Sequence, residues 1–385
     1  MQRQSFSPPS TDVVIVGGGP AGAAAALMLA RSDISVVLLD GGQQRLAVGE
    51  TLPPAVRPVL DSLGVRAQLT DEGHCASVGS WSAWGSAEPW GRDFIFNRFG
   101  HGWHLDRRRF DALLRAAARS AGARLAHASL VASEPLPAGG FRLHLAGGRH
   151  LDARIVLDAS GRSAVFARQR GVRRIAVDRM VALVGYVARR PDAGAEPAAS
   201  LVEATSAGWW YSAPLPQDRL IVAFMTDADL ARGGGDLTDG WLDRLAGAQH
   251  TAARALRFGA GLAGPPVIVS AVSGRLERFG GADWLALGDA AATQDPLSSE
   301  GILLAMQSGI DGALAARQAL HGESDALAGA AKRREAVWFN YLDERDRNYA
   351  AERRWPKAPF WQRRSPEPAQ GSRHIHRTQE QRSSA

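Results

Sequence analysis

The sequence predicts an α/β protein in which a Rossmann-like dinucleotide-binding domain carries an inserted antiparallel β-sheet domain and a helical C-terminal region. Three observations support this fold class. An apolar strand near the N-terminus runs into a glycine-rich turn and a helix, later apolar strands also end in glycine or aspartate, and the middle of the chain alternates between apolar and polar residues. The 385 residues are enough for two or three domains.

The first strand and turn carry a nucleotide-binding pattern. Residues 13–16 are all apolar and lead into three glycines with the spacing GxGxxG, which an alanine-rich helix follows. The first glycine permits the turn, the second lets a pyrophosphate approach the backbone, and the third lets the helix pack against the strand. The free N–H groups at the helix N-terminus then face the phosphates. The predicted cofactor-binding residues are Gly17, Gly19, Pro20, Ala21 and Gly22.

A second strand, residues 36–39, ends at Asp40. This carboxylate lies about 20 residues beyond the turn, where it can accept hydrogen bonds from a ribose hydroxyl. The glycine spacing recurs at residues 259–264, but two prolines follow it directly, and prolines have no N–H groups to offer a phosphate. We therefore expect one dinucleotide site, at the first motif.

Residues 41–54 are too rich in glycine and proline for a regular helix and predict a loop. This loop carries Glu50 and can return toward the cofactor, although a rigid connector is the alternative interpretation. Four tryptophans follow at positions 81, 84, 90 and 103, with little helical periodicity. Such density favours packing between β-strands, and the alternative is that one or two of the rings line a pocket.

A helix is predicted to begin near Arg107, because four apolar residues among positions 110–117 fall on one helical face. From this position Arg107 can reach a phosphate or a ring edge, and a solvated charge is the alternative. Residues 124–131 and 141–145 then alternate between apolar and polar types, as strands do.

Two further buried strands, residues 154–157 and 284–287, end in groups that suit a cofactor. The predicted cofactor-binding residues that follow them are Asp158, Gly161, Gly288 and Asp289. Four strand ends thus point at one cofactor. A helix beginning near Gly301 adds another positively polarised N-terminus.

Residues 177–272 contain alternating apolar strands, including 180–187 and 220–224, which predict a separate antiparallel sheet. We expect the substrate to bind there. Trp209 and Tyr211 lie at the end of one strand, where they can wall a pocket, and ordinary core packing is the alternative.

The order of these motifs resembles that of the flavin-dependent monooxygenases of the aromatic hydroxylase superfamily, over roughly residues 12–315. The motifs are GxGxxG, an acidic strand end, DxxGR, and GDAA followed by DPxxxxGI. The resemblance implies FAD as the cofactor, with Asp289 holding its ribityl chain. It also implies that the helix after Pro296, beginning at Gly301 and Ile302, faces the isoalloxazine ring.

Finer motifs resemble the tryptophan-halogenase-like branch: the loop at residues 49–54, the helix start at residues 103–111 and the proline loop at residues 295–302. Within this branch the chain resembles the flavoproteins that mature tryptophylquinone enzymes, such as quinohaemoprotein amine dehydrogenase and amino-acid oxidases. Those flavoproteins modify a tryptophan within a protein.

The resemblance implies an FAD-dependent monooxygenase that hydroxylates an aromatic side chain, a protein- or peptide-borne tryptophan, through a flavin C4a-hydroperoxide. The alternatives are hydroxylation of a small aromatic or polyketide metabolite, and a flavin-bound chaperone without turnover. The reductant is either NAD(P)H bound directly or reduced flavin from a separate reductase. Because the cofactor carries the chemistry, no side-chain base is obligatory. Glu300 and Glu50 are the candidates for polar catalytic roles, with helix capping or loop stabilisation as the alternatives.

Three departures from the branch argue against halogenation. Its halogenases use an early lysine, whereas the first lysine here is Lys332. Their proline loop has a glutamate and a Thr-Gly halide site, where this chain has Ser298 and then Glu300, whose carboxylate would repel a halide. Tyr211 also replaces the second tryptophan of their Gly-Trp-x-Trp signature.

Composition argues against other classes. The formal net charge of +6 comes from the residues after 331, which include 13 Lys or Arg and 7 Asp or Glu, so we do not expect nucleic-acid binding. The chain has no apolar run of about 18 residues and no signal-peptide core. Its single cysteine, Cys75, favours a reducing compartment. We expect a cytoplasmic protein without a metal site.

The expected domains are an FAD-binding domain of residues 11–75, 104–176 and 273–320, a β-sheet substrate domain of residues 76–103 and 177–272, a helical region at 321–362, and a disordered tail at 363–385. The tail has too little apolar surface to offset the entropy lost on ordering.

Overall fold

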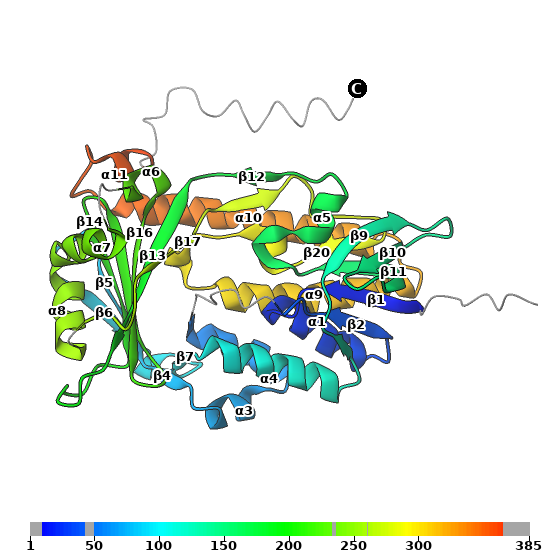
Figure 1. The fold of residues 1–385 in the computed structure, drawn as a ribbon, viewed down its shortest axis with the longest axis horizontal. Helices are drawn as coiled ribbons and strands as arrows, with labels where there is room; N and C mark the ends of the chain where they lie inside the picture. The colour runs from blue at the N-terminus through cyan, green and yellow to red at the C-terminus, as the bar shows by residue number, and fades with distance from the viewer. Residues whose placement is uncertain (1–9, 43–49, 233–235, 260, 365–385) are drawn as a thin grey trace, which may run out of the picture.

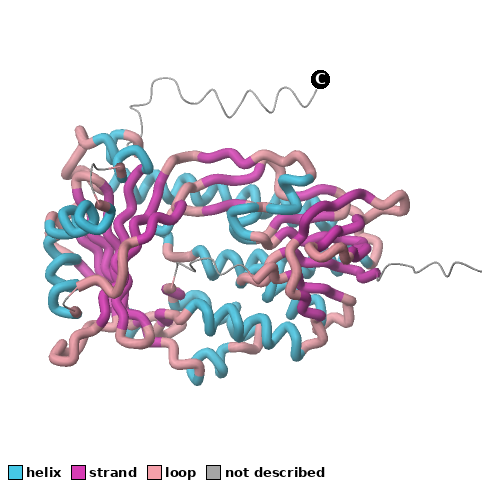
Figure 2. The backbone as a smooth tube through the Cα atoms, viewed as in Figure 1, coloured by secondary structure: helices cyan, strands magenta, loops and turns pink. Residues whose placement is uncertain are grey.

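The computed structural model describes residues 10–42, 50–232, 236–259 and 261–364. Figure 1 shows a nucleotide-binding part on the right and a large twisted sheet on the left, joined by long helices. Figure 2 shows most of the strands in these two places, with shorter strands between them. The expected tail lies outside the described residues from residue 365 onward, as does most of the glycine-rich loop before Glu50.

An eight-stranded sheet forms the nucleotide-binding part. Its main path runs in the order β19-β20-β11-β1-β2-β8, and β10 joins β9 to β11. The strands are β1 (Ser10–Val16), β2 (Val36–Leu39), β8 (Arg124–Ala126), β9 (Leu130–Pro135), β10 (Phe141–Leu145), β11 (His150–Asp158), β19 (Gly280–Gly281) and β20 (Trp284–Ala286). Strands β2, β1, β11 and β20 are parallel neighbours, so their carboxyl ends lie at one edge of the sheet.

The strand expected over residues 124–131 is two strands. β8 pairs with β2, whereas β9 pairs with β10 in the antiparallel ribbon. The expectation of one strand was wrong because the alternating pattern continues through the short turn between the two and cannot show that their partners differ.

Helices cover this sheet and connect it to the rest of the molecule. They are α1 (Pro20–Ala30), α2 (Arg57–Ser62), α3 (Arg66–Asp71), α4 (Arg107–Ser120), α5 (Val165–Gln169), α9 (Gly301–Leu320) and α10 (Ala326–Ala351). Helices α1 and α9 pack closely because their facing residues are small. A Cβ atom on Gly309 would lie 2.2 Å from the carbonyl oxygen of Ala21. This contact sets the N-terminus of α9 relative to that of α1.

The second sheet has seven strands in the order β17-β13-β16-β15-β14-β5-β6. Its strands are β5 (Gly79–Ala83), β6 (Trp90–Asp93), β13 (Met180–Ala188), β14 (Ala199–Thr205), β15 (Gly208–Leu215), β16 (Arg219–Asp227) and β17 (Val267–Ser270). The central pairs are antiparallel as expected, but β5, which comes from a distant part of the chain, pairs with β14 in parallel.

Three helices in the same region were not foreseen. They are α6 (Ala228–Ala231), α7 (Leu237–Ala246) and α8 (Gln249–Phe258). Residues of α7 and α8 pack with Trp210 and Leu183 on one face of the sheet, which is the outer face in Figure 1. Gly259 ends α8, so the second glycine motif does not form a strand, turn and helix.

The other face of the seven-stranded sheet, called the inner face below, looks toward the nucleotide-binding part. Trp209, Tyr211 and Met180 lie on it, together with residues of α10 and of α11 (Pro359–Gln362). Two small sheets lie between the two parts: β3 (Thr51–Leu52), β7 (Gly102–His104) and β4 (Cys75–Ser77) form one, and β12 (Arg174–Ala176), β18 (Gly274–Leu276) and β21 (Ala292–Thr293) form the other.

No helix in the described part of the chain is both long and apolar enough to cross a bilayer.

Candidate functional site

The glycines of the first motif have different steric roles. Gly17 has a φ of +114°, and a Cβ there would lie 2.3 Å from the carbonyl oxygen of Ala159. A Cβ on Gly22 would lie 1.9 Å from the carbonyl oxygen of Gly17. Around Gly19, by contrast, an added Cβ would meet nothing within 4 Å. Gly17 and Gly22 therefore allow the turn to form, whereas Gly19 leaves one face of the turn open.

Two helices begin with N–H groups that no side chain caps. Helix α1 starts with Pro20 after Gly19, without a side-chain cap or an acidic residue in its first turn. Helix α9 starts after Glu300, again without a side-chain cap, and a Cβ on Gly301 would meet nothing within 4 Å. Uncapped N–H groups and the helix dipole attract anions. The open, uncapped turn of α1 thus fits the pyrophosphate of a dinucleotide such as FAD.

Asp40 follows β2, beside the glycine turn, where the ribose was expected. Its carboxylate lies 3.5 Å from the guanidinium of Arg115 and accepts a hydrogen bond from the backbone N–H of Gly42. Arg115 also donates to the carbonyl oxygen of Gly18 at 3.1 Å. Arg115 of α4, which sequence reasoning missed, therefore holds the acidic strand end against the glycine turn.

Asp289 follows β20 and its side chain is 45% exposed. Arg162, directly after Gly161, lies 3.7 Å from it. The preceding Gly288 has a φ of +51°, and its N–H donates to the hydroxyl of Ser308 on α9 at 2.6 Å. The turn at Gly288 is therefore anchored to α9 through Ser308, while the Asp289 carboxylate remains exposed.

Asp158 does not reach the surface, which corrects the expectation that it contacts the cofactor directly. Its side chain is completely buried and accepts hydrogen bonds from Ser160 and from the N–H of Ala167. Burial raises the pKa of this carboxyl group. Asp158 therefore shapes the loop that presents Gly161, whose φ is +67°.

Arg107 is the first residue of α4, after the N-cap Asp106. Its guanidinium pairs with Asp111 one turn later, at 3.3 Å, and the side chain is 13% exposed. The predicted contact with the cofactor stays a prediction.

Helix α10 stabilises the proline loop through Asp295 and Tyr349. Asp295 is buried, accepts the N–H of Leu297 at 3.0 Å and accepts the hydroxyl proton of Tyr349 at 2.7 Å. Pro296 begins a short 3-10 turn, Pro296–Ser298, that leads to Glu300 and α9. Ile302 is 8% exposed and packs into the core of the nucleotide-binding part, so its side chain stabilises the helix start.

Trp209 and Tyr211, the two predicted pocket residues, differ in exposure. Trp209 is completely buried, and its indole N–H donates to the hydroxyl of Tyr349 at 3.1 Å. The expectation that Trp209 walls a pocket is therefore corrected, because its ring is core packing. Tyr211 is only partly buried, and its hydroxyl lies 2.5 Å from that of Thr51.

Thr51 connects Tyr211 to a buried histidine that the sequence did not single out. Thr51 and His104 are opposite each other in the pair β3–β7, and the Thr51 hydroxyl lies 2.9 Å from Nδ1 of His104. Burial, with Arg254 as a smaller contribution, lowers the pKa of His104 to about 4, so the ring is neutral.

The two candidate catalytic carboxylates have different neighbours. Glu50 is 4% exposed and accepts a hydrogen bond from the Tyr186 hydroxyl at 3.4 Å. Glu300, at the start of α9, has a pKa raised by burial and further by the charge of Glu344 on α10. Glu50 therefore lies against the inner face of the sheet, and Glu300 lies between the two long helices.

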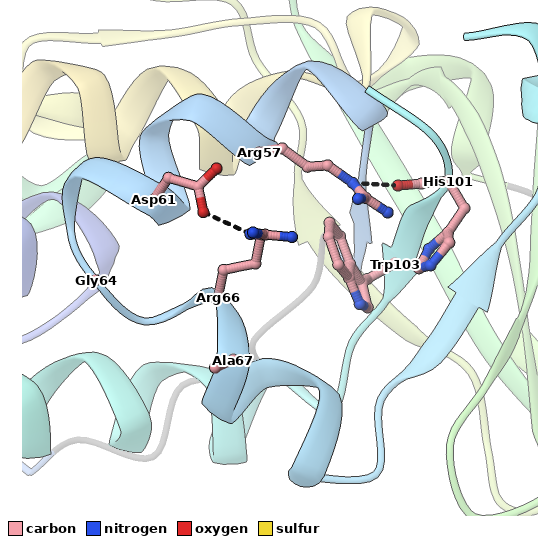
Figure 3. Close-up of a pocket in the computed structure, with 7 residues that line it drawn as sticks. All are labelled: Arg57, Asp61, Gly64, Arg66, Ala67, His101 and Trp103. Atoms are coloured by element: carbon pink, nitrogen blue, oxygen red, sulfur yellow. Dashed lines mark hydrogen bonds and ion pairs between the residues drawn. The ribbon is translucent and has the colours of Figure 1, made fainter. Parts of the chain in front are cut away.

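A surface pocket of about 480 Å³ opens beside α2, and none of the predicted site residues lines it. Figure 3 shows the guanidinium of Arg57 over the Trp103 ring, 5.1 Å from its centre, and Arg66 paired with Asp61. Trp103 precedes His104 on β7, and successive side chains of a strand point to opposite faces. The pocket thus lies on the other side of β7 from the Thr51 and Tyr211 hydroxyls.

Comparisons with known proteins show the family and the fold of this chain. A profile of the tryptophan halogenase family matches residues 91–382, and a profile of the pyridine nucleotide-disulphide oxidoreductases matches residues 11–131. The chain is 29% identical over 350 residues to LodB of Marinomonas mediterranea, which is named as an FAD-dependent oxidoreductase. That alignment covers 88% of this chain and 92% of LodB.

Two solved structures have the same fold. The myxobacterial chondrochloren halogenase CndH superimposes with a TM-score of 0.84 at 23% identity, covering 98% of this chain and 89% of CndH. The peptidyl tryptophan dihydroxylase QhpG, described as essential for tryptophylquinone cofactor biogenesis, superimposes with a TM-score of 0.76 at 24% identity. That alignment covers 95% of this chain and 81% of QhpG. The predicted fold class is therefore confirmed.

Proposed function

Because the chain belongs to the tryptophan halogenase family of flavin-dependent oxidoreductases, we propose that it hydroxylates a tryptophan side chain held within a protein or peptide. FAD fits the open glycine turn described above, and when reduced it supplies an electrophilic oxygen atom from O2. One oxygen atom enters the ring and the other leaves as water, with two electrons and two protons taken from a reductant. NAD(P)H and a reductase-supplied flavin both satisfy this balance.

The residues of this chain would bind and position the reactants. The turn at Gly17 and Gly19 and the N-terminus of α1 would hold the pyrophosphate, and Asp40 and Asp289 would accept hydrogen bonds from sugar hydroxyls. The α9 N-terminus would face the flavin ring. Glu300 and Glu50 are the candidate carboxylates for taking up the proton that the aromatic ring loses on hydroxylation.

One observation carries the proposal of a polypeptide substrate. A row of directly paired residues crosses the inner face of the seven-stranded sheet from its edge strand β6 to the buried hydroxyl cluster. The row consists of Trp90, Ser82, Val202 and Tyr211. Directly paired side chains share one face of a sheet. The row therefore leads along one surface from an exposed strand edge to Tyr211.

The start of this row is apolar and open to solvent. Trp90 is 61% exposed, and Ile95 and Phe96, shortly after β6, are 80% and 95% exposed. Exposed apolar side chains along one strand edge are suited to contact a polypeptide. A free metabolite would not need such a surface, whereas a polypeptide that carries the target tryptophan would cover it.

Halogenation is not proposed. The sequence has no lysine before Lys332, and a carboxylate, Glu300, stands in the proline loop. Chlorinated or brominated product from an indole in the presence of halide would contradict this part of the proposal.

The test is aerobic incubation of the reduced holoenzyme with polypeptides encoded beside its gene, followed by intact mass measurement. The expected result is a gain of one or two oxygen atoms on one polypeptide, at a tryptophan, in the presence of a reductant. Free tryptophan and a small phenol are the matched controls. Efficient hydroxylation of these controls without modification of any polypeptide would refute the proposal.

A further inference from the structure

A chain of hydrogen bonds links His104, Thr51 and Tyr211, which lie on three strands that are far apart in sequence. The Thr51 hydroxyl lies 2.9 Å from Nδ1 of His104 and 2.5 Å from the Tyr211 hydroxyl. His104 is completely buried, whereas Tyr211 is partly buried. The outer end of the chain is therefore the phenol, on the inner face of the sheet.

The direction of the hydrogen bonds follows from the buried end. The neutral His104 ring has one N–H, and the backbone carbonyl of Ala198 acts on this ring as a hydrogen-bond acceptor. A proton on Nε2 faces this carbonyl favourably, whereas a lone pair there would be repelled by it. Nδ1 is then an acceptor, so Thr51 donates to it.

The same reasoning orients the phenol. Because the Thr51 proton is used toward His104, the Thr51 oxygen accepts, and Tyr211 donates its proton to Thr51. The phenol oxygen keeps lone pairs but has no proton left to offer. Burial, and then the nearby Glu50, raise the pKa of Tyr211, so the phenol remains neutral. Its remaining lone pair is an acceptor on the inner face of the sheet.

We propose that the Tyr211 oxygen accepts a hydrogen bond from the ring N–H of the substrate, and so selects an indole over aromatic rings without such a donor. This inference rests on the proposed function for the identity of the substrate. It adds the residue that fixes the orientation of the indole, with Thr51 and His104 as positioning residues. A ring held by its N–H presents a defined edge to the oxygen donor, whereas a ring held by shape alone can rotate.

Binding to the oxidised holoenzyme tests this without any polypeptide. The probes are 3-methylindole and 3-methylbenzothiophene, which have nearly the same shape, but only the first has an N–H donor. Dissociation constants are measured by calorimetry with flavin absorbance as a second signal. The preference for the indole should be about ten-fold higher in the wild type than in Tyr211→Phe, which lacks the acceptor.

Matched variants separate this role from general packing. Tyr186→Phe removes a phenol from the same face and should keep the preference. Thr51→Ser keeps the hydroxyl and should also keep the preference, whereas Thr51→Val frees the phenol proton and should lower it. Flavin absorbance of each variant confirms that it is folded and loaded.

Three results would overturn the inference: no binding of 3-methylindole to the wild type, equal preference in the wild type and Tyr211→Phe, or an equal loss in Tyr186→Phe. None of these depends on turnover. If the preference behaves as expected but no polypeptide gains oxygen, the proposed function fails and the acceptor role of Tyr211 stands.

Discussion

Single buried polar residues fix the loops and side chains around the candidate site. His104 is neutral and fixes Thr51, Asp158 is enclosed and shapes a loop, and Asp295 accepts the hydroxyl of Tyr349. Each of these groups is costly to bury without partners. Their protonation and packing therefore affect both stability and the geometry of the site.

The protonation of His104 predicts a loss of stability in mild acid. Its pKa is about 4 in the folded protein against 6.5 for an ordinary histidine, so between these values the unfolded chain binds a proton that the folded chain does not. The free energy of unfolding should therefore fall as pH drops from 6.5 to 4, by about 3 kcal/mol in total from this group. Urea unfolding at several pH values measures it, and His104→Gln, which cannot titrate, is the control. Identical pH slopes in both proteins would show that His104 is not protected.

The glycine turn predicts different outcomes for two substitutions. Gly19→Val adds side-chain atoms into open space, so the protein should fold with unchanged circular dichroism but lose bound flavin. Gly22→Ala places a Cβ 1.9 Å from a carbonyl oxygen and should reduce the yield of folded protein itself. Absorbance and thermal unfolding distinguish these outcomes. Full flavin occupancy in Gly19→Val would contradict the position of the cofactor.

At the scale of elements, α10 supports the proline loop. Tyr349 on α10 donates to Asp295 at 2.7 Å and accepts from the Trp209 N–H at 3.1 Å. Arg345 on the same helix lies 3.1 Å from Asp178 and 3.6 Å from Asp295. The helix thereby connects the loop before α9 to the inner face of the sheet, so that this loop and this face share one support.

Removing the Tyr349 hydroxyl tests this support. Tyr349→Phe leaves the Asp295 carboxylate and the Trp209 N–H each short of a partner, which should cost about 1 to 3 kcal/mol of unfolding free energy. Trp209→Phe is the matched variant, and the double variant should lose less than the sum of the two. Chemical denaturation measures all three. Strictly additive losses would show that the two rings are not coupled through this hydrogen bond.

At the scale of the whole molecule, the last described residues cover part of the inner face of the seven-stranded sheet. Phe360 and Trp361 of α11 are almost completely buried on its inner face. Arg364 is also buried and pairs with Asp227 at 2.7 Å, which Arg363 contacts as well. The chain up to Arg364 is therefore part of the fold, and this includes Arg363 and Arg364 of the expected tail.

Two truncations test this boundary. Removal of residues 365–385 should leave soluble, flavin-bound protein. Removal from residue 359 onward also deletes Phe360, Trp361 and both arginines, which exposes apolar surface and leaves Asp227 buried without its partners, at a cost of about 3 to 5 kcal/mol or more. Soluble yield and flavin content are the measurements. Equal behaviour of the two proteins would contradict the boundary.

The sequence by itself determined the fold class, the family and the enzyme class, and the comparisons confirm these predictions. It also located the glycine turn at Gly17 to Gly22 and the helix that begins at Gly301. These features depend on a few consecutive residues, whose backbone conformation and helix-forming tendency are local. Local properties can be read from a single sequence.

Only the tertiary structure decided which side chains meet. The bond between Thr51 and Tyr211 joins residues 160 positions apart, and that between Trp209 and Tyr349 joins residues 140 apart. No pattern within a strand or helix distinguishes the completely buried Trp209 from the partly buried Tyr211 two residues later. Their difference arises from the elements packed over each ring, because exposure and hydrogen bonding depend on neighbours that the chain brings together only when it folds.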